Sequence, residues 1–392
     1  MKLLIVHNFY TNLTGEDLVV EEAARILKNS KKIVVVEYYK YSKNFQKLPW
    51  VKKIIILLKA NMPFYIPREL KETLNREKPD VVQIHNLTPL INIWILRELK
   101  RRKLPILYYI NNYRLFCPRG TCFLKDKPCT SCADKSLIFC IINNCLENFP
   151  YSLLYAYRVF LERLFLRYID LFVSNTNFTK VFYNKYLPKI NITIVRGYVD
   201  MPEEFEDIDG EKKEFVVFAA RLVKEKGLSI VLESAVSLKD IRFKICGEGP
   251  EFRLYKDMAI RKNLKNIEFL GLVERKKLLK LIKEARVLIL PSLWHEVYNR
   301  VIIEAMSLGT PVIASKIGTN VEIIQHNKTG FLFDPEDITS LVELIKRLWS
   351  DENLRKNISF EAYAETKRWN NSERYAKDLL DIYKNLLSKT GH

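Results

Sequence analysis

Residues 215–227 read FVVFAARLVKEKG, and this stretch decides the fold class. Its short apolar run is rich in β-branched and aromatic residues, which predicts a strand over 215–219. Arg221, Lys226 and Gly227 follow where that strand ends. Two cations and a flexible backbone at the edge of a sheet suit a diphosphate, although two solvated surface charges would look the same.

The stretch belongs to a series of short apolar runs separated by helical patterns. In the second half of the chain, further strands are predicted at 242–246, 267–270, 287–290 and 311–314. In the first half, strands are predicted at 3–6, 33–38, 81–84, 106–110 and 171–174, with a helix over 16–27. Strands that alternate with helices are typical of βαβ units, so the sequence predicts an α/β protein with parallel sheets.

The length and one acidic segment predict how the chain is divided. A chain of 392 residues exceeds one ordinary domain of roughly 150 residues. Residues 200–213 are acidic, contain Pro and Gly, and separate the two strand series. We therefore expect an N-terminal Rossmann-like domain over 1–199, a linker over 200–213 and a second such domain over 214–370. A C-terminal helix over 371–392 is expected to pack back on the N-terminal domain.

The composition excludes some classes of protein and leaves others open. Hydrophobic residues make up 48% and charged residues 28%, enough apolar surface for two cores. The net charge of +18 attracts polyanions, whether nucleic acid, anionic membrane or phosphorylated substrate, although a Lys- and Glu-rich surface also fits a heat-adapted protein. The first apolar run ends at His7, and no run reaches the roughly 18 residues of a membrane span. We therefore expect a cytoplasmic protein.

Two other strand ends in the second half carry candidate ligand contacts. Gly247, Glu248 and Gly249 follow the strand at 242–246, and two glycines let a ligand approach the main chain, as they would also allow a tight turn. Glu296 follows the strand at 287–290, and residues 297–300 are predicted to form the first turn of the next helix. The N–H groups of a helix start favour an anion. Glu296, just before that helix, and Glu304, inside it, could both reach a sugar held there.

The first half has its own polar groups at predicted strand ends. Gly15, Glu16 and Asp17 open the helix that follows the first strand, which is also an ordinary helix start. His85 follows the strand at 81–84, and Asn111 follows the strand at 106–110. The carboxyl ends of parallel strands share one edge, which is where ligands bind in such sheets.

In order along the chain, these blocks resemble the retaining glycosyltransferases of family 4, which have the GT-B fold. The similarity covers nearly the whole chain and is strongest over 215–333, in Arg221…Lys226-Gly227, Gly247-Glu248-Gly249-Pro250, Glu296…Glu304-Ala305, the segment 309–315 and the segment 329–332. The resemblance implies two Rossmann-like domains whose sheets face across a cleft. It also implies sugar transfer with retention from a UDP- or GDP-sugar, without an obligatory metal.

The resemblance also implies roles for residues. Arg221 and Lys226 would bind the donor diphosphate, Glu304 the ribose hydroxyls and Glu296 the donor sugar. The donor-binding set is completed by the following residues: Gly247, Glu248, Gly249, Asn299, Arg300 and Val301.

In this family the N-terminal domain binds the acceptor, here a glycan or a lipid-linked group. The loop Gly15, Glu16 and Asp17 would take part, with His85 and Asn111 as candidate catalytic groups. Relatives commonly have His where this chain has Asn111. A side-chain base at that position is therefore not expected.

Six of the seven cysteines lie in a loop over 117–145. Without a secretion signal, such clustering favours a metal over disulfides. We predict a structural zinc site from Cys117, Cys129, Cys132 and Cys145, with Cys140 as the alternative fourth ligand. Disulfides stay open, because heat-adapted intracellular proteins sometimes contain them.

Residues 50–66 and 151–168 combine bulky apolar side chains with cations. They are candidates for lying on the anionic inner face of a membrane, where a lipid-linked acceptor would be found. The alternative is that each is a helix with an apolar face in the core.

Two rival functions remain. One is a zinc-containing, basic nucleic-acid-binding protein, in which the donor motifs would have no role. We therefore expect no nucleic-acid partner. The other is a family member that binds a nucleotide without turnover.

Overall fold

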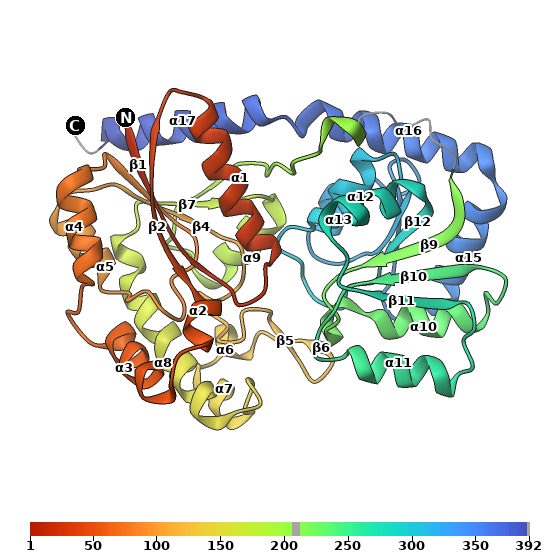
Figure 1. Ribbon diagram of the computed structural model, residues 1–392, viewed down its shortest axis with the longest axis horizontal. Coiled ribbons are helices and arrows are strands. Elements are labelled where there is room, and N and C mark those ends of the chain that lie inside the picture. Colours follow the sequence, from red (N-terminus) through yellow and green to blue (C-terminus); the bar gives the residue numbers. More distant parts are fainter. Residues whose placement is uncertain (206–211, 390–392) are drawn as a thin grey trace. The chain divides into compact units, whose positions relative to one another are not determined.

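The computed structural model describes residues 1–205 and 212–389 and divides the chain into two units. Unit 1 comprises Met1–Thr121, Thr130–Tyr198 and the C-terminal residues from Asn371 on, and unit 2 comprises Cys122–Cys129 and Val199–Asn370. Each unit has a six-stranded parallel sheet with helices packed on it (Figure 1). The predicted α/β class and the two Rossmann-like sheets are confirmed.

The sheet of unit 1 has the order β2-β1-β3-β4-β7-β8. Its strands are β1 (Lys2–Phe9), β2 (Val34–Tyr41), β3 (Val81–Ile84), β4 (Ile106–Tyr109), β7 (Leu171–Ser174) and β8 (Ile192–Ile194). All five predicted strands are present, and the short edge strand β8 was missed. The chain leaves β1 toward β2 on one side and continues through β3 on the other. Ligands in open α/β sheets bind at such a switch point, here the carboxyl ends of β1 and β3.

The first and last helices of unit 1 pack together. Helix α1 (Gly15–Asn29) begins with a capping box between Thr14 and Asp17. Helix α17 (Ser372–Lys389) buries Leu379 and Tyr383 in one core cluster with Leu3 of β1 and with residues of α1. The other helices are α2 (Ser42–Gln46), α3 (Trp50–Asn61), α4 (Arg68–Glu77), α5 (Ile95–Arg101), α6 (Ser131–Asp134), α7 (Ile138–Ile142), α8 (Phe149–Phe165), η1 (Leu166–Tyr168) and α9 (Asn177–Tyr186).

The sheet of unit 2 has the order β11-β10-β9-β12-β13-β14. Its strands are β9 (Lys213–Ala219), β10 (Arg242–Cys246), β11 (Ile267–Gly271), β12 (Ala285–Leu290), β13 (Val312–Ser315) and β14 (Phe331–Phe333). The five predicted strands are present, and β14 was missed. The chain turns back between β11 and β12, so the switch point lies at the carboxyl ends of β9 and β12.

Helices cover both faces of this sheet and give unit 2 its core. They are η2 (Glu203–Phe205), η3 (Lys224–Lys226), α10 (Leu228–Val236), α11 (Phe252–Arg261), α12 (Arg275–Glu284), α13 (Arg300–Ser307), α14 (Asn320–Ile323), α15 (Ile338–Ser350) and α16 (Glu352–Trp369). The apolar residues of β9 and β12 lie at the centre of one core cluster with these helices. That packing holds the ends of the two strands in a fixed register.

The predicted boundary near residue 200 lies where unit 1 gives way to unit 2, although part of the predicted linker, residues 206–211, lies outside the described residues. The predicted Cys-rich loop is more structured than a loop. It contains α6, α7 and an antiparallel hairpin of β5 (Phe123–Leu124) and β6 (Lys127–Pro128). The hairpin is part of unit 2, in which Asp126 lies 3.6 Å from the ammonium of Lys224. In the described part of the chain, no helix is both long and apolar enough to cross a membrane.

Candidate functional sites

An ion pair occupies the switch point of unit 2. Lys226 follows β9 and Glu296 follows β12, and the Lys226 ammonium lies 2.6 Å from Glu296 Oε1. Ser292 donates a second hydrogen bond to the same oxygen at 2.8 Å. Glu296 is 4% exposed, so its carboxylate is held in one orientation. Arg221, two residues after the end of β9, is exposed. The structure thus brings Lys226 and Glu296 together, and their roles toward a donor stay a prediction.

The helix after Glu296 starts later than predicted. Residues 297–300 were expected to form its first turn, but α13 begins at Arg300 and Asn299 is its N-cap residue. The Asn299 side chain makes no capping hydrogen bond and instead donates to Asn320 Oδ1 at 3.3 Å. Asn320 is in turn fixed by a hydrogen bond to the Ser315 carbonyl. The Asn299 side chain therefore does not cap the first turn of α13, and contact of an anion with the main-chain N–H groups at Arg300 and Val301 stays a prediction.

Glu304 has a partner that sequence reasoning missed. It is 2% exposed, and its Oε1 accepts a hydrogen bond from the Arg275 guanidinium at 2.6 Å. Arg275, at the start of α12, also bonds the Asp200 carbonyl at 2.9 Å. A buried carboxylate held by one guanidinium keeps its other oxygen oriented, which suits a contact to hydroxyls. In the sequence, Arg275 looks like any other cation of a Lys- and Arg-rich helix.

The two glycines after β10 have a packing role. A Cβ on Gly247 would lie 1.9 Å from the Ala220 carbonyl oxygen, and a Cβ on Gly249 would lie 2.2 Å from that of Leu222. The loop after β9 therefore comes close to this main chain, and Leu222 N–H bonds the Glu248 carbonyl at 2.9 Å. Larger residues would push Arg221 out of place. Direct contact of Gly247, Glu248 and Gly249 with a ligand stays a prediction.

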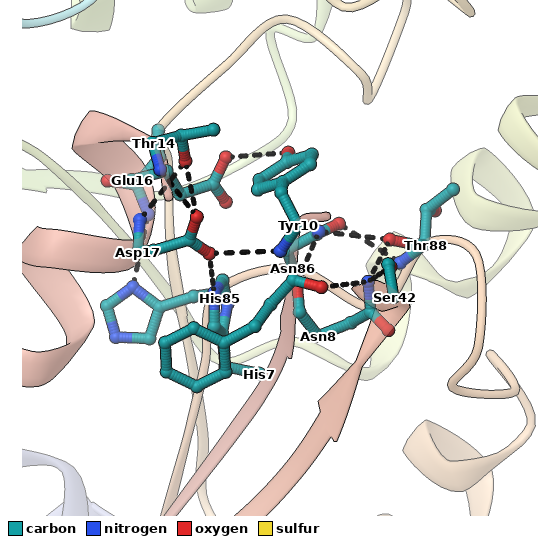
Figure 2. Close-up of polar contacts among 12 residues, drawn as sticks. His7, Asn8, Tyr10, Thr14, Glu16, Asp17, Ser42, His85, Asn86 and Thr88 are labelled. Carbon is teal, nitrogen blue, oxygen red and sulfur yellow. Dashed lines mark hydrogen bonds and ion pairs between the residues drawn. The ribbon is translucent and has the colours of Figure 1, made fainter. Parts of the chain in front are cut away.

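The switch point of unit 1 has a buried polar network at the end of β1 (Figure 2). His7 is fully buried and its Nε2 lies 2.9 Å from Asp17 Oδ1. The other Asp17 oxygen accepts from the main-chain N–H and the hydroxyl of Thr14, both at 2.8 Å. Asp17 is 1% exposed and both of its carboxylate oxygens have partners within the protein, so Asp17 positions the start of α1. The neighbouring Gly15 is exposed.

Glu16 stands in the same loop and is better placed for a ligand than Asp17. Its Oε2 accepts hydrogen bonds from the Tyr10 hydroxyl and from Asn112 Nδ2, both at 2.9 Å. Arg114 donates to the Tyr10 hydroxyl at 3.1 Å. Glu16 is only partly buried, so this group of polar side chains could bind sugar hydroxyls.

His85 and Asn111 meet at the next two strand ends. Asn111 Nδ2 lies 3.1 Å from His85 Nδ1, and Gln83 Nε2 lies 2.8 Å from His85 Nε2. The Tyr383 hydroxyl of α17 donates to Gln83 Oε1, and the His85 ring stacks on Tyr109 at 5.0 Å. Burial, and to a lesser extent His7, lowers the pKa of His85 well below its usual value of about 6.5. His85 is therefore a neutral, oriented ring at neutral pH.

The cysteine segment brings several thiols together. Buried Cys132 and Cys140 share an apolar cluster, and Cys145 packs against it. A hydrogen bond with the Cys145 thiol and burial raise the pKa of Cys140, with contributions from Cys132 and Cys117. Among the residues with described positions, no three His, Cys, Asp or Glu side chains are arranged to hold a metal ion. The zinc site at Cys117, Cys129, Cys132 and Cys145 stays a prediction.

Residues 200–365 match the family described as glycosyl transferases group 1. The matched segment is therefore similar to the glycosyl transferases group 1. It includes the Lys226–Glu296 pair and the start of α13. The chain is also 28% identical over 187 residues to the uncharacterized glycosyltransferase MJ1607 of Methanocaldococcus jannaschii, an alignment that covers 47% of each chain. The chain thus spans about half the length of the curated relatives it matches, or less.

Two solved structures resemble nearly the whole chain. Sucrose-phosphate synthase from Thermosynechococcus elongatus has a TM-score of 0.72 at 15% identity and covers 99% of both chains. Anabaena HepE in complex with UDP-glucose has a TM-score of 0.69 at 15% identity, with 98% of this chain and 100% of that chain covered. Together with the two parallel sheets, this similarity confirms the predicted GT-B fold. The segment similar to group 1 therefore lies in a chain that has the fold expected from its strand-end motifs.

Proposed function

We propose that this protein is a retaining glycosyltransferase that moves a sugar from a UDP- or GDP-sugar to a glycan or a lipid-linked acceptor in surface-glycan synthesis. The observation that carries the proposal is the Lys226–Glu296 pair beside the start of α13, within the segment that matches the glycosyl transferases group 1. It combines a cation, an oriented carboxylate and helix N–H groups where a nucleotide sugar needs them.

In the proposed donor site, fixed positive groups stabilise the leaving diphosphate. Arg221, Lys226 and the main-chain N–H groups at Arg300 and Val301 would share its charge without a metal ion. Glu304 would bind the ribose through the oxygen that Arg275 leaves available, and Glu296 would bind the sugar hydroxyls. The complexes of HepE with UDP and UDP-glucose support a uridine donor as the first to test.

In the proposed acceptor site, unit 1 orients an acceptor hydroxyl but supplies no titrating base. His85 is buried with a pKa well below its usual value, and the Asn111 amide does not titrate. A phosphate oxygen of the donor would therefore take the acceptor proton as the new glycosidic bond forms on the face that the diphosphate leaves. Asn111 and Glu16 would hold the acceptor by hydrogen bonds.

The test is to incubate the protein with a panel of UDP- and GDP-sugars and glycan or polyprenyl-phosphate acceptors, and to assign the new anomeric bond by NMR. The proposal expects a product with the anomeric configuration of the donor, formed equally well in EDTA. An inverted product would contradict retention. Tight nucleotide binding without transfer or hydrolysis on any donor would instead support a non-catalytic nucleotide-binding protein.

A further inference from the structure

Helix α3 of unit 1 leaves an apolar stripe uncovered. Val51, Ile55, Leu58 and Met62 recur at spacings of four, three and four residues, so they lie on one face in and just beyond the helix. They are 45–65% exposed, and Trp50 at the start of the helix is 72% exposed. A soluble helix would normally turn such a face toward the core.

Helix α8 presents a second stripe of the same kind. Its members recur every three or four residues and are 43–57% exposed, namely Phe149, Leu153, Tyr157, Phe160 and Leu164. The alternative of a helix with an apolar face in the core also holds for part of α8, where Val159, Leu161 and Phe165 are buried. Helix α8 thus has buried residues in the core and an apolar face outside it, and α3 has a similar apolar face with Ala60 buried near its end.

The two helices are held in place by a buried arginine. Arg158 of α8 is 3% exposed and donates to the Ala60 carbonyl at the end of α3 at 2.9 Å. Its Nε lies 3.0 Å from Glu162 Oε1, which balances its charge. Asn92 also donates to the Lys59 carbonyl at 2.7 Å and the Met62 carbonyl at 2.8 Å. The exposed stripe of α3 is therefore anchored to the unit rather than being a loosely attached segment.

The charges around α3 have one sign. Residues 38–68 contain seven Lys and Arg residues and no Asp or Glu. Of these, Lys40 pairs with Glu69 and Arg68 with Glu72. The other five form no ion pair with a described residue, namely Lys43, Lys47, Lys52, Lys53 and Lys59. Apolar side chains flanked by cations match an anionic lipid surface, whose headgroups attract the ammonium groups while the acyl region accepts the side chains.

We infer that the α3 and α8 stripes dock unit 1 on an anionic bilayer, with Trp50, Ile55 and Leu58 inserted below the headgroups. A second copy of the chain is a poorer occupant, because the α3 surface would meet its own cations without a carboxylate to pair with. The inference rests on the proposed function only in that a lipid-linked acceptor would lie in the same membrane. Its test needs no sugar transfer, so the two can fail separately.

The test is co-sedimentation of the full chain with vesicles of phosphatidylcholine alone or mixed with phosphatidylglycerol. We expect binding to the mixed vesicles that weakens as salt rises, and at least tenfold weaker binding for Ile55→Glu with Leu58→Glu. Lys52→Gln with Lys53→Gln should reduce binding several-fold and lessen its salt dependence. The matched control is Leu272→Glu in unit 2, a residue that is 77% exposed outside the stripes. Equal binding by all variants would overturn the inference.

Trp50 gives an independent readout. On mixed vesicles its fluorescence should shift to the blue and be quenched by lipids brominated on their acyl chains, and Trp50→Phe should lose most of that quenching. Absence of quenching in the wild type would show that the stripe does not insert. Sedimentation velocity without lipid tests whether a second copy of the chain covers the stripe instead. If the protein is a dimer that Ile55→Glu with Leu58→Glu dissociates, the stripe belongs to a dimer interface and the lipid assignment is overturned.

Discussion

The Lys226 ammonium lies 2.6 Å from a Glu296 carboxylate that is almost completely buried. The two residues come from the ends of β9 and β12, the strands on either side of the switch point in unit 2. Without a ligand, the lysine charge is therefore partly neutralised by the glutamate. A diphosphate has to compete with Glu296 for this ammonium. A change at Glu296 should therefore affect nucleotide binding and sugar transfer differently.

Glu296→Gln should separate the two effects. The amide keeps a hydrogen bond acceptor for Ser292 but removes the negative charge, so UDP should bind as tightly as in the wild type or several-fold more tightly. Transfer should fall at least tenfold in kcat, because a carboxylate that orients the reacting sugar is lost. Calorimetry and steady-state kinetics on the same preparation measure both. Weaker UDP binding with unchanged kcat would reverse the assignment.

The Arg275–Glu304 pair predicts a different pattern. Glu304→Gln should raise the donor KM with a smaller change in kcat, since ribose contacts are made in the ground state and the transition state alike. Arg275→Ala should lower the melting temperature, because it leaves the buried Glu304 carboxylate without its cation. The expected loss in the free energy of unfolding is on the order of 1 kcal/mol, since the arginine of this pair is partly exposed. An unchanged donor KM in Glu304→Gln would remove this residue from the donor site.

Most of the fold could be predicted from the sequence, because the central strands are apolar runs that stand out from helical patterns. The missed strands of the two parallel sheets, β8 and β14, have three residues each, too few to show a pattern. The start of α13 was placed too early, because Val297 lies in the loop before the helix, where it is 3% exposed. Asn299 is a preferred N-cap residue and was the signal that could have corrected the boundary.

The candidate sites were predicted only in part. Strand-end positions of Lys226 and Glu296 indicate that the two residues meet, since neighbouring parallel strands end at one edge. Contacts between distant segments give no such signal: Arg275 lies 29 residues from Glu304, and Tyr383 lies 300 residues from Gln83. A glutamine within the buried strand β3 was the one hint that a polar partner lies beneath His85.

The buried imidazole of His85 predicts how stability depends on pH. Its pKa in the folded state is well below the unfolded value of about 6.5, so below pH 6.5 the unfolded chain takes up a proton that the folded chain does not. His85 should therefore cost about 1 kcal/mol of stability per pH unit as the pH falls below 6.5, and nothing above it. Denaturant unfolding from pH 5 to 7.5 should give a shallower acid slope for His85→Gln. Identical slopes would show that His85 is protonated in the folded chain.

The same low pKa bears on catalysis. If no side-chain base serves the acceptor, the wild-type kcat should have no acidic limb near pH 6.5, and Asn111→Ala should reduce kcat/KM by about 1–3 kcal/mol without changing the pH profile. The pH profile of kcat for the wild type beside His85→Gln checks this. A limb near pH 6.5 that the His85→Gln change removes would make His85 a titrating group in turnover, while one that persists would assign the titration elsewhere.

The cysteine segment gives a prediction about metal content. If four of its thiolates hold a structural zinc ion, protein purified without chelator should contain about one equivalent of zinc, and chelation should lower its melting temperature. Cys132→Ser should lose the metal, whereas Cys246→Ser, in the core of unit 2, should keep it. Elemental analysis that finds no metal in protein grown with zinc would leave packing as the role of the segment.

The most direct test of the donor site is calorimetric titration of UDP or GDP, whichever binds the wild type, into the double variant Arg221→Ala with Lys226→Gln. Glutamine at 226 keeps a hydrogen bond donor near Glu296, so the fold should keep its melting temperature while both cations are lost. The account predicts that nucleoside-diphosphate affinity falls by about 2–3 kcal/mol, roughly thirty- to more than a hundredfold. Unchanged affinity in a folded double variant would contradict a donor site at the ends of β9 and β12.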